Sequence, residues 1–133
     1  MTVYKNNIFR FRNFPVYKDS RVFRKELKDF SRKNFPVEER YCLTSQLWRS
    51  LDSILLNIAE GSERYTDKDF SHFLNMSQTS LNEVAACLDA ALDDEYLMKK
   101  DHKYFSDKAK NIYKQLRAFS SKVRKDNMKK GDC

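Results

Sequence analysis

The stretch LLNIAEGSERYTDKDF, Leu55 to Phe70, joins two amphipathic segments, and its interpretation decides the fold. Gly61, one of only two glycines in the chain, follows the last apolar residue of the first segment. A glycine there favours a left-handed residue that ends a helix, because it has no Cβ to clash. Thr66 is a good N-cap for the next helix, and Tyr65 and Phe70 have the spacing of a hydrophobic staple. We therefore predict a helical hairpin here, since a phosphate loop would need more glycine and a preceding strand.

Hydrophobic spacings of three and four recur in four segments, and strict alternation is nowhere sustained. The pattern predicts helices over residues 15–33, 38–61, 66–95 and 101–125, and a short disordered tail after about residue 126. Short connections make successive helices antiparallel neighbours. A chain of 133 residues is most simply one domain, residues 1–133. The predicted fold class is all-α, an up-down-up-down four-helix bundle.

Composition and charge narrow the class of protein. Three cysteines without a CxxC pair are typical of reduced thiols rather than a disulfide framework. No signal-peptide core and no run of about 18 apolar residues is present, so we expect a cytoplasmic protein without a membrane partner. The net charge is +7, with both ends of the chain basic and the middle acidic. This asymmetry is a clue to partners.

The second predicted helix carries a polar stripe beside its apolar one, with spacings of four and three: Gln46, Ser50, Ser53, Asn57 and Glu60. One interpretation is a polar groove that binds a ligand. The other is a hydrogen-bonding seam of small side chains that lets another helix approach closely. We favour the seam. A buried Glu60 would then need a basic or amide partner.

Catalytic and metal chemistry find little support in the sequence. A di-iron bundle requires two Glu-x-x-His pairs and two further glutamates, and only Asp69-x-x-His72 comes near that pattern. His102 stands alone, and no histidine lies at local spacing from Cys42 or Cys87. We predict no enzyme, no catalytic residue, no metal and no cofactor. A carboxylate-bridged metal site is kept as a remote alternative.

The basic residues are the main functional lead. They lie about 200° from the apolar seams of the first and fourth predicted helices. Because these helices are neighbours in the bundle, the two stripes would merge into one basic face. Such a face attracts the phosphates of RNA or DNA without reading sequence, although solvated outer faces are the plain alternative. The candidate nucleic-acid-binding residues are Arg21, Lys25, Lys28, Arg32, Lys110, Lys114, Arg117 and Arg124.

The run SQLWRSLDSILLNIAEGSER, Ser45 to Arg64, closely resembles the signature of the 23S rRNA intervening-sequence proteins. This four-helix-bundle family includes the accessory variability protein of diversity-generating retroelements. The chain departs from the usual pattern at Trp48, which replaces an arginine, and at Leu55, which replaces a frequent proline. The candidate family-motif residues are Gln46, Arg49, Ser53, Asn57, Glu60 and Gly61.

The resemblance implies a bundle that assembles into a ring-shaped homopentamer with no known enzymatic activity. It also implies that RNA, DNA, a reverse transcriptase or another protein is a partner. Trp48 fits such an assembly, because a large aromatic among charged neighbours often anchors an interface or a core. Our main hypothesis is a non-enzymatic, homo-oligomeric module that binds nucleic acid or protein through its basic face. The alternative is a structural scaffold, or a partner of a reverse transcriptase, with no direct nucleic-acid role.

Overall fold

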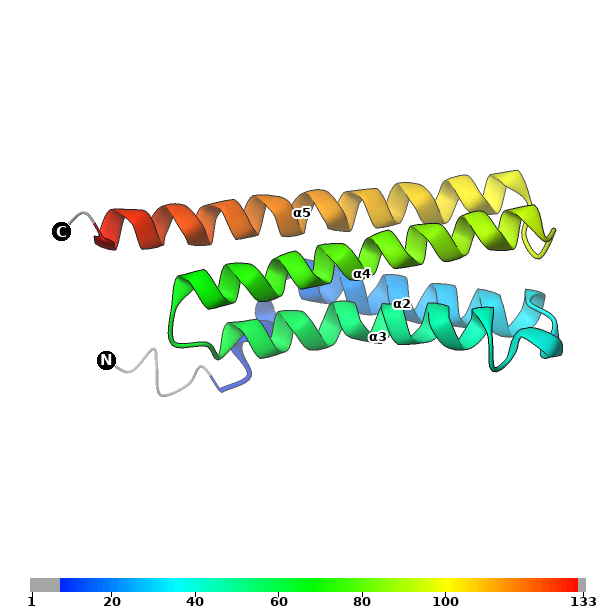
Figure 1. Cartoon of the computed structure of the whole chain (residues 1–133), viewed down its shortest axis with the longest axis horizontal. Coiled ribbons are helices and arrows are strands. Elements are labelled where there is room, and N and C mark those ends of the chain that lie inside the picture. The colour runs from blue at the N-terminus through cyan, green and yellow to red at the C-terminus, as the bar shows by residue number, and fades with distance from the viewer. Residues whose placement is uncertain (1–7, 132–133) are drawn as a thin grey trace.

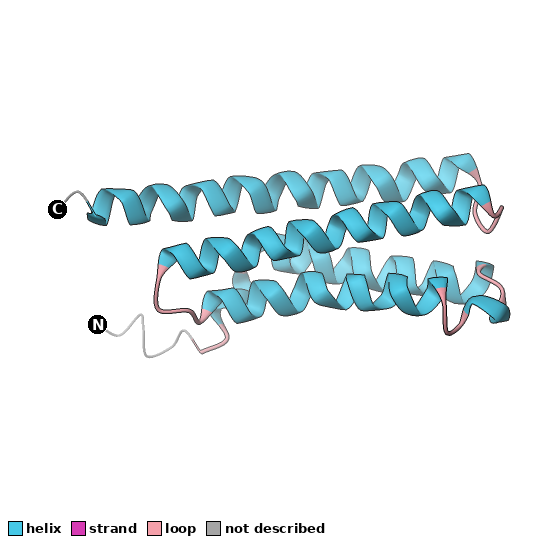
Figure 2. Ribbon diagram, in the orientation of Figure 1, coloured by secondary structure: helices cyan, strands magenta, loops and turns pink. Residues whose placement is uncertain are grey.

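The computed structural model describes the backbone of residues 8–131 and the side chains of residues 8–125. Within these residues the chain has four α-helices, two short 3₁₀ segments and no strand, which confirms the all-α four-helix fold (Figures 1 and 2). The elements are η1 (Arg10–Asn13), α2 (Pro15–Asn34), η2 (Val37–Glu39), α3 (Leu43–Ser62), α4 (Asp67–Asp93) and α5 (Lys99–Gly131).

Prolines mark both ends of the helix α2, Pro15 as its first residue and Pro36 two residues after its last. Pro15 occupies the first helical position, where its missing N–H costs nothing and its fixed φ suits the helix. At the other end Phe35 is extended, as expected for the residue before Pro36. The observed bounds lie within a residue of the predicted 15–33.

The start of α3 differs from the prediction of residue 38. Residues Val37–Glu39 form the separate turn η2, and α3 begins at Leu43. The Glu39 carboxylate accepts a hydrogen bond from the Leu43 amide at 3.4 Å and one from the Tyr96 hydroxyl at 2.8 Å. The hydrogen bond from Tyr96 to Glu39, with burial, raises the pKa of Tyr96 to about 12. Glu39 thus ties the α2–α3 connection to the α4–α5 connection at the same end of the bundle (Figure 1).

The α3–α4 turn corrects two local predictions. Gly61 is a buried residue inside α3, without positive φ, so the expected left-handed cap is wrong. Its role is close approach, because a Cβ at Gly61 would lie 2.7 Å from the Phe73 Cβ and 3.0 Å from Phe70 Cδ1. The staple is also wrong, since the Tyr65 side chain is fully exposed. The Thr66 cap is confirmed: its hydroxyl accepts the Asp69 amide at 3.1 Å.

The last connection and the C-terminal helix also differ in detail from the sequence pattern. The helix α4 ends at Asp93, two residues before the predicted end, and Glu95 takes a left-handed φ of 65°. The helix α5 starts at Lys99 and continues through Gly131, so the predicted disordered tail after residue 126 is helical as far as the structure describes it. In Figure 1 α5 extends past the α3–α4 turn.

The predicted apolar seams meet in one core along the bundle. Its centre is formed by side chains that are essentially fully buried: Phe23, Leu27, Leu47, Leu51, Ile54, Ile58, Leu74, Val84, Leu88 and Leu116. Aromatic rings join α2 to α5, with centroids 5.2 Å apart for Phe30 and Phe105 and 5.1 Å apart for Phe14 and Phe119. These contacts confirm that the first and fourth helices are neighbours.

Candidate functional site

The polar stripe of α3 packs against α4 through short hydroxyl side chains. Ser77, fully buried on α4, donates to the Ile54 carbonyl at 2.9 Å, and the Ser80 hydroxyl donates to Ser53 Oγ at 2.8 Å. Such small groups let two helix backbones approach closely while keeping every buried hydroxyl bonded. Every buried side-chain nitrogen and oxygen among the described residues has a partner. For Ser53 this contact with Ser80 is of the kind that an architectural seam requires.

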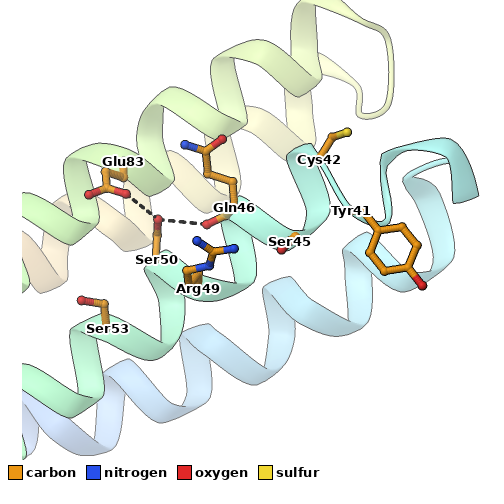
Figure 3. Close-up of a pocket in the computed structure, with 8 residues that line it drawn as sticks. All are labelled: Tyr41, Cys42, Ser45, Gln46, Arg49, Ser50, Ser53 and Glu83. Atoms are coloured by element: carbon orange, nitrogen blue, oxygen red, sulfur yellow. Dashed lines mark hydrogen bonds between the residues drawn. The ribbon is translucent and has the colours of Figure 1, made fainter.

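Toward solvent the same seam widens into an open groove of about 550 Å³. The Ser50 hydroxyl donates to Glu83 Oε2 at 2.9 Å and contacts the Gln46 carbonyl oxygen at 3.0 Å. Arg49 reaches into the groove beside them and makes no ion pair with a described residue (Figure 3). The groove is lined by Tyr41, Cys42, Ser45, Gln46, Arg49, Ser50, Ser53 and Glu83.

The last two members of the stripe are engaged locally. The Asn57 amide donates to the backbone oxygen and to Oγ of Ser53, both at 2.9 Å. Glu60 is exposed and pairs with Arg64 one turn further on. The basic partner expected for Glu60 is present, but the carboxylate is at the surface rather than in the core. Asn57 and Glu60 therefore bond to their own helix and the turn after it, whereas Gly61 packs against α4.

The predicted basic stripe of α2 is only partly available. Arg21 is exposed and makes no ion pair with a described residue. Lys25 and Arg32 are exposed but share the carboxylate of Asp29, at 3.0 and 2.6 Å. The hydrogen bond from Lys25, with the charge of Arg32, holds the pKa of Asp29 below its ordinary value. Two of the four cations thus already have a counter-charge on their own helix.

Lys28 does not belong to an outward face. The residue is 6% exposed, and its ammonium lies 2.8 Å from Asp52 Oδ1 on α3 and 5.2 Å from the Trp48 ring centroid. Arg24 binds the same Asp52 oxygen at 2.6 Å. Partial burial raises the pKa of Asp52, but hydrogen bonds from Lys28 and Arg24 outweigh it and leave that pKa below its ordinary value. Lys28 therefore fastens α2 to α3, and its prediction as an outward residue is wrong.

The four predicted cations of α5 are all exposed, and none makes an ion pair with a described residue: Lys110, Lys114, Arg117 and Arg124. Between α2 and α5, however, lie acidic side chains. Asp19 accepts a hydrogen bond from Gln115 at 2.9 Å, and a hydrogen bond with Glu26 raises the pKa of Tyr104. The basic stripes of α2 and α5 are therefore separated by carboxylates and do not merge into one continuous face.

Trp48 lies half-buried at the α2–α3 contact. Its indole Nε1 donates to Ser31 Oγ at 2.8 Å, and the guanidinium carbon of Arg32 lies 4.8 Å from its ring centroid. The sequence predicts Trp48 as an anchor but does not identify two of the residues around it. Ser31 accepts the hydrogen bond from Trp48, and Asp52 binds Lys28, which lies against the indole ring. In the sequence Ser31 and Asp52 stand out only as polar residues next to the apolar seams of their helices.

The described residues also bear on metal and membrane binding. Among the described residues no three His, Cys, Asp or Glu side chains are grouped to hold a metal ion. The His102 ring contacts Asp89 Oδ1 at 2.8 Å across the α4–α5 pair. Burial raises the pKa of the Cys87 thiol. No helix in the described part of the chain is long and apolar enough to cross a membrane.

Comparison with known proteins places these features in a family. A crystal structure of a protein of unknown function from the S23 ribosomal protein family of Bacteroides thetaiotaomicron has a similar fold, with a TM-score of 0.69 and 23% identity. The similarity covers 79% of this chain and 97% of that one. No curated protein matches the sequence. The sequence profile of the 23S rRNA-intervening sequence protein family matches residues 12–118, and the chain therefore belongs to that family.

Proposed function

We propose that the protein is a non-enzymatic, homo-oligomeric module that binds RNA or DNA through the outer face of α5, assisted by Arg21 on α2. The observation that carries this proposal is the row of exposed α5 cations, none of which makes an ion pair with a described residue. Counter-charge matters because a cation already paired in the protein gains little from a phosphate. The basic surface is thus narrower than the sequence pattern suggested.

The register of the helices supports Arg21 as part of this surface. Gln115 contacts Asp19, and Phe119 contacts Phe14. Arg21 and Lys114 therefore lie at about the same position along the bundle axis. A nucleic-acid backbone that runs across the bundle would meet both cations. The carboxylates between the helices disfavour a duplex pressed deep into the α2–α5 boundary, and favour contact along the outer ridge of α5.

The test is the salt dependence of binding to a labelled duplex DNA or structured RNA. Each neutralised phosphate releases counterions, so affinity should fall steeply with salt, and Lys114→Glu should reduce the slope by about one unit or more. Lys68→Glu, an equal charge change at an exposed position on α4, is the matched control and should have a smaller effect. Absence of binding at low ionic strength would refute this function.

A second candidate, a ring-shaped homopentameric scaffold that presents surfaces to other proteins, is favoured by exposed apolar side chains on the α3–α4 side. Leu56 is 66% exposed and Met76 is 39% exposed, and both lie along the helix pair that carries the groove. Large apolar side chains gathered at a surface are typical of interfaces. On this hypothesis Leu56→Glu dissociates the assembly, whereas Lys114→Glu leaves it intact.

Light scattering at micromolar concentration distinguishes a monomer from an assembly. A monomeric mass for the unmodified protein would contradict assembly, while leaving nucleic-acid binding by single bundles to be judged by the salt titration. A pentameric mass that Leu56→Glu converts to monomer would support the scaffold and locate its interface. Helix content by circular dichroism controls for unfolding of the variant.

A further inference from the structure

Two arginine–aromatic pairs gather at the corner where α2 passes into α3. The guanidinium carbon of Arg32 lies 4.8 Å from the Trp48 ring centroid, and that of Arg40 lies 5.6 Å from the Tyr41 centroid. Tyr41 is 85% exposed. Cations and aromatic rings interleaved at an exposed corner provide both charge and stacking surfaces.

Arg32, Trp48 and Arg40 line a notch of about 240 Å³. The Trp48 ring, Phe35 and Pro36 form apolar walls, and Arg32 and Arg40 line it as cations. None of its lining side chains among the described residues is a carboxylate. Asp29 is paired with Arg32 beside the notch, so the notch suits a flat apolar group whose negative charge lies toward Arg40.

We propose that this notch binds one unpaired nucleobase stacked against Trp48, with Arg40 at its phosphate. The proposal rests on the nucleic-acid-binding function above and deepens it, because it makes single-stranded or looped nucleic acid the ligand. A base in a duplex presents its flat face to its neighbours, whereas an unpaired base can lie on an aromatic ring.

The platform is fixed before a ligand arrives. The bond from Trp48 Nε1 to Ser31 Oγ, at 2.8 Å, and the buried Lys28 ammonium at 5.2 Å hold the indole in place. Arg32 is paired with the half-buried Asp29 at 2.6 Å, whereas Arg40 makes no ion pair with a described residue. Arg40 is therefore the cation available to a phosphate, and Arg32 has only to leave the Trp48 ring when a base takes its place.

Trp48 is the only tryptophan, so its fluorescence reports the notch alone. The unmodified protein is titrated with adenosine monophosphate, with inorganic phosphate, and with a single-stranded oligonucleotide of about ten bases and its duplex. Stacking should quench Trp48 with the nucleotide and the single strand, and much less with phosphate or duplex. A mononucleotide has little polyelectrolyte attraction, which separates stacking from general binding to basic surfaces.

Variants are then compared by anisotropy of the labelled single strand. Trp48→Leu should weaken binding about 5- to 150-fold, the range expected for losing one stacked base, whereas Trp48→Phe should retain most of it. Arg40→Ala, at an exposed position that should not affect folding, should weaken nucleotide binding severalfold. Lys68→Ala on α4 is the control and should leave it unchanged.

The outcomes distinguish this proposal from the function on which it rests. A single strand that binds with salt dependence but leaves Trp48 fluorescence and the Arg40→Ala affinity unchanged refutes the notch and leaves the α5 surface standing. Quenching by the nucleotide without retention of longer nucleic acid supports the notch and refutes the wider function. Equal quenching by phosphate overturns base stacking, and no binding of any probe overturns both.

Discussion

Replacing Gly61 by alanine sets two effects of opposite sign against each other. Alanine is the better helix former by about 1 kcal/mol, so an unconstrained helical glycine would be stabilised by the change. At Gly61 the new Cβ would lie 2.7 Å from the Phe73 Cβ, an atom fixed to the α4 backbone. Ordinary carbon contacts lie at about 3.5–4.0 Å, so α3 and α4 must separate by roughly 1 Å at this point.

Separation at Gly61 is costly because the same helix pair is held by short contacts nearby. Overpacking of a tight contact costs about 1–3 kcal/mol, which exceeds or cancels the propensity gain. We expect Gly61→Ala to lower the free energy of unfolding by up to about 2 kcal/mol in urea titrations. Enlarging the side chain further, with Gly61→Val, should lower it more.

The control is Ala59→Gly, two residues earlier in α3 and half-buried. It should cost about 1 kcal/mol from propensity alone and so calibrate that effect in this helix. If Gly61→Ala stabilises the protein by the amount that Ala59→Gly destabilises it, the close-approach explanation is refuted. Comparable slopes of free energy against urea would show that the unfolded states are alike.

Three further perturbations follow from local geometry. Thr66→Ala removes the hydroxyl that accepts the Asp69 amide and should cost about 1 kcal/mol in urea unfolding, while Thr66→Ser should restore it. Glu95→Gly relieves a left-handed φ of 65° and should raise the free energy of unfolding by up to about 1 kcal/mol; destabilisation would show that the Glu95 side chain matters more than its backbone. Because the pKa of Asp52 is depressed in the folded state, its stabilising effect is complete above the ordinary value of 3.8 and is lost as pH falls through the lower folded value. The difference in unfolding free energy between the unmodified protein and Asp52→Asn should therefore shrink in acid, and a difference that stays constant to about pH 2 would contradict the Lys28–Asp52 pairing.

The helical pattern was sufficient to predict the fold, because the apolar spacing of each segment records which face is buried. The four seams lie in one core, and α2 and α5 are neighbours, as the up-down topology requires. Helix ends were less predictable. The acidic residues at 38–39 resemble a helical first turn, yet Glu39 is used to bind the Leu43 amide and Tyr96, and the helix starts later.

The candidate site was predicted less well, for a physical reason. A helical wheel gives the angle of Lys28 from its own seam, but not the reach of Trp48 and Asp52 from α3 across that angle. In the same way, a glycine retained for close packing and a glycine at a helix cap look alike in sequence. Gly61 is distinguished only by the position of Phe73 on the next helix. Interhelical distances decide both cases.

Because Lys28 is buried, the rate at which its amine is chemically labelled reports the motion of α2. Amine-acylating reagents need an accessible, unprotonated amine, and the Lys28 ammonium is enclosed and bonded to Asp52. Lys33, on the same helix, is exposed to the reagent throughout. The ratio of their labelling rates therefore measures how often α2 lifts from α3, an opening below the level of global unfolding.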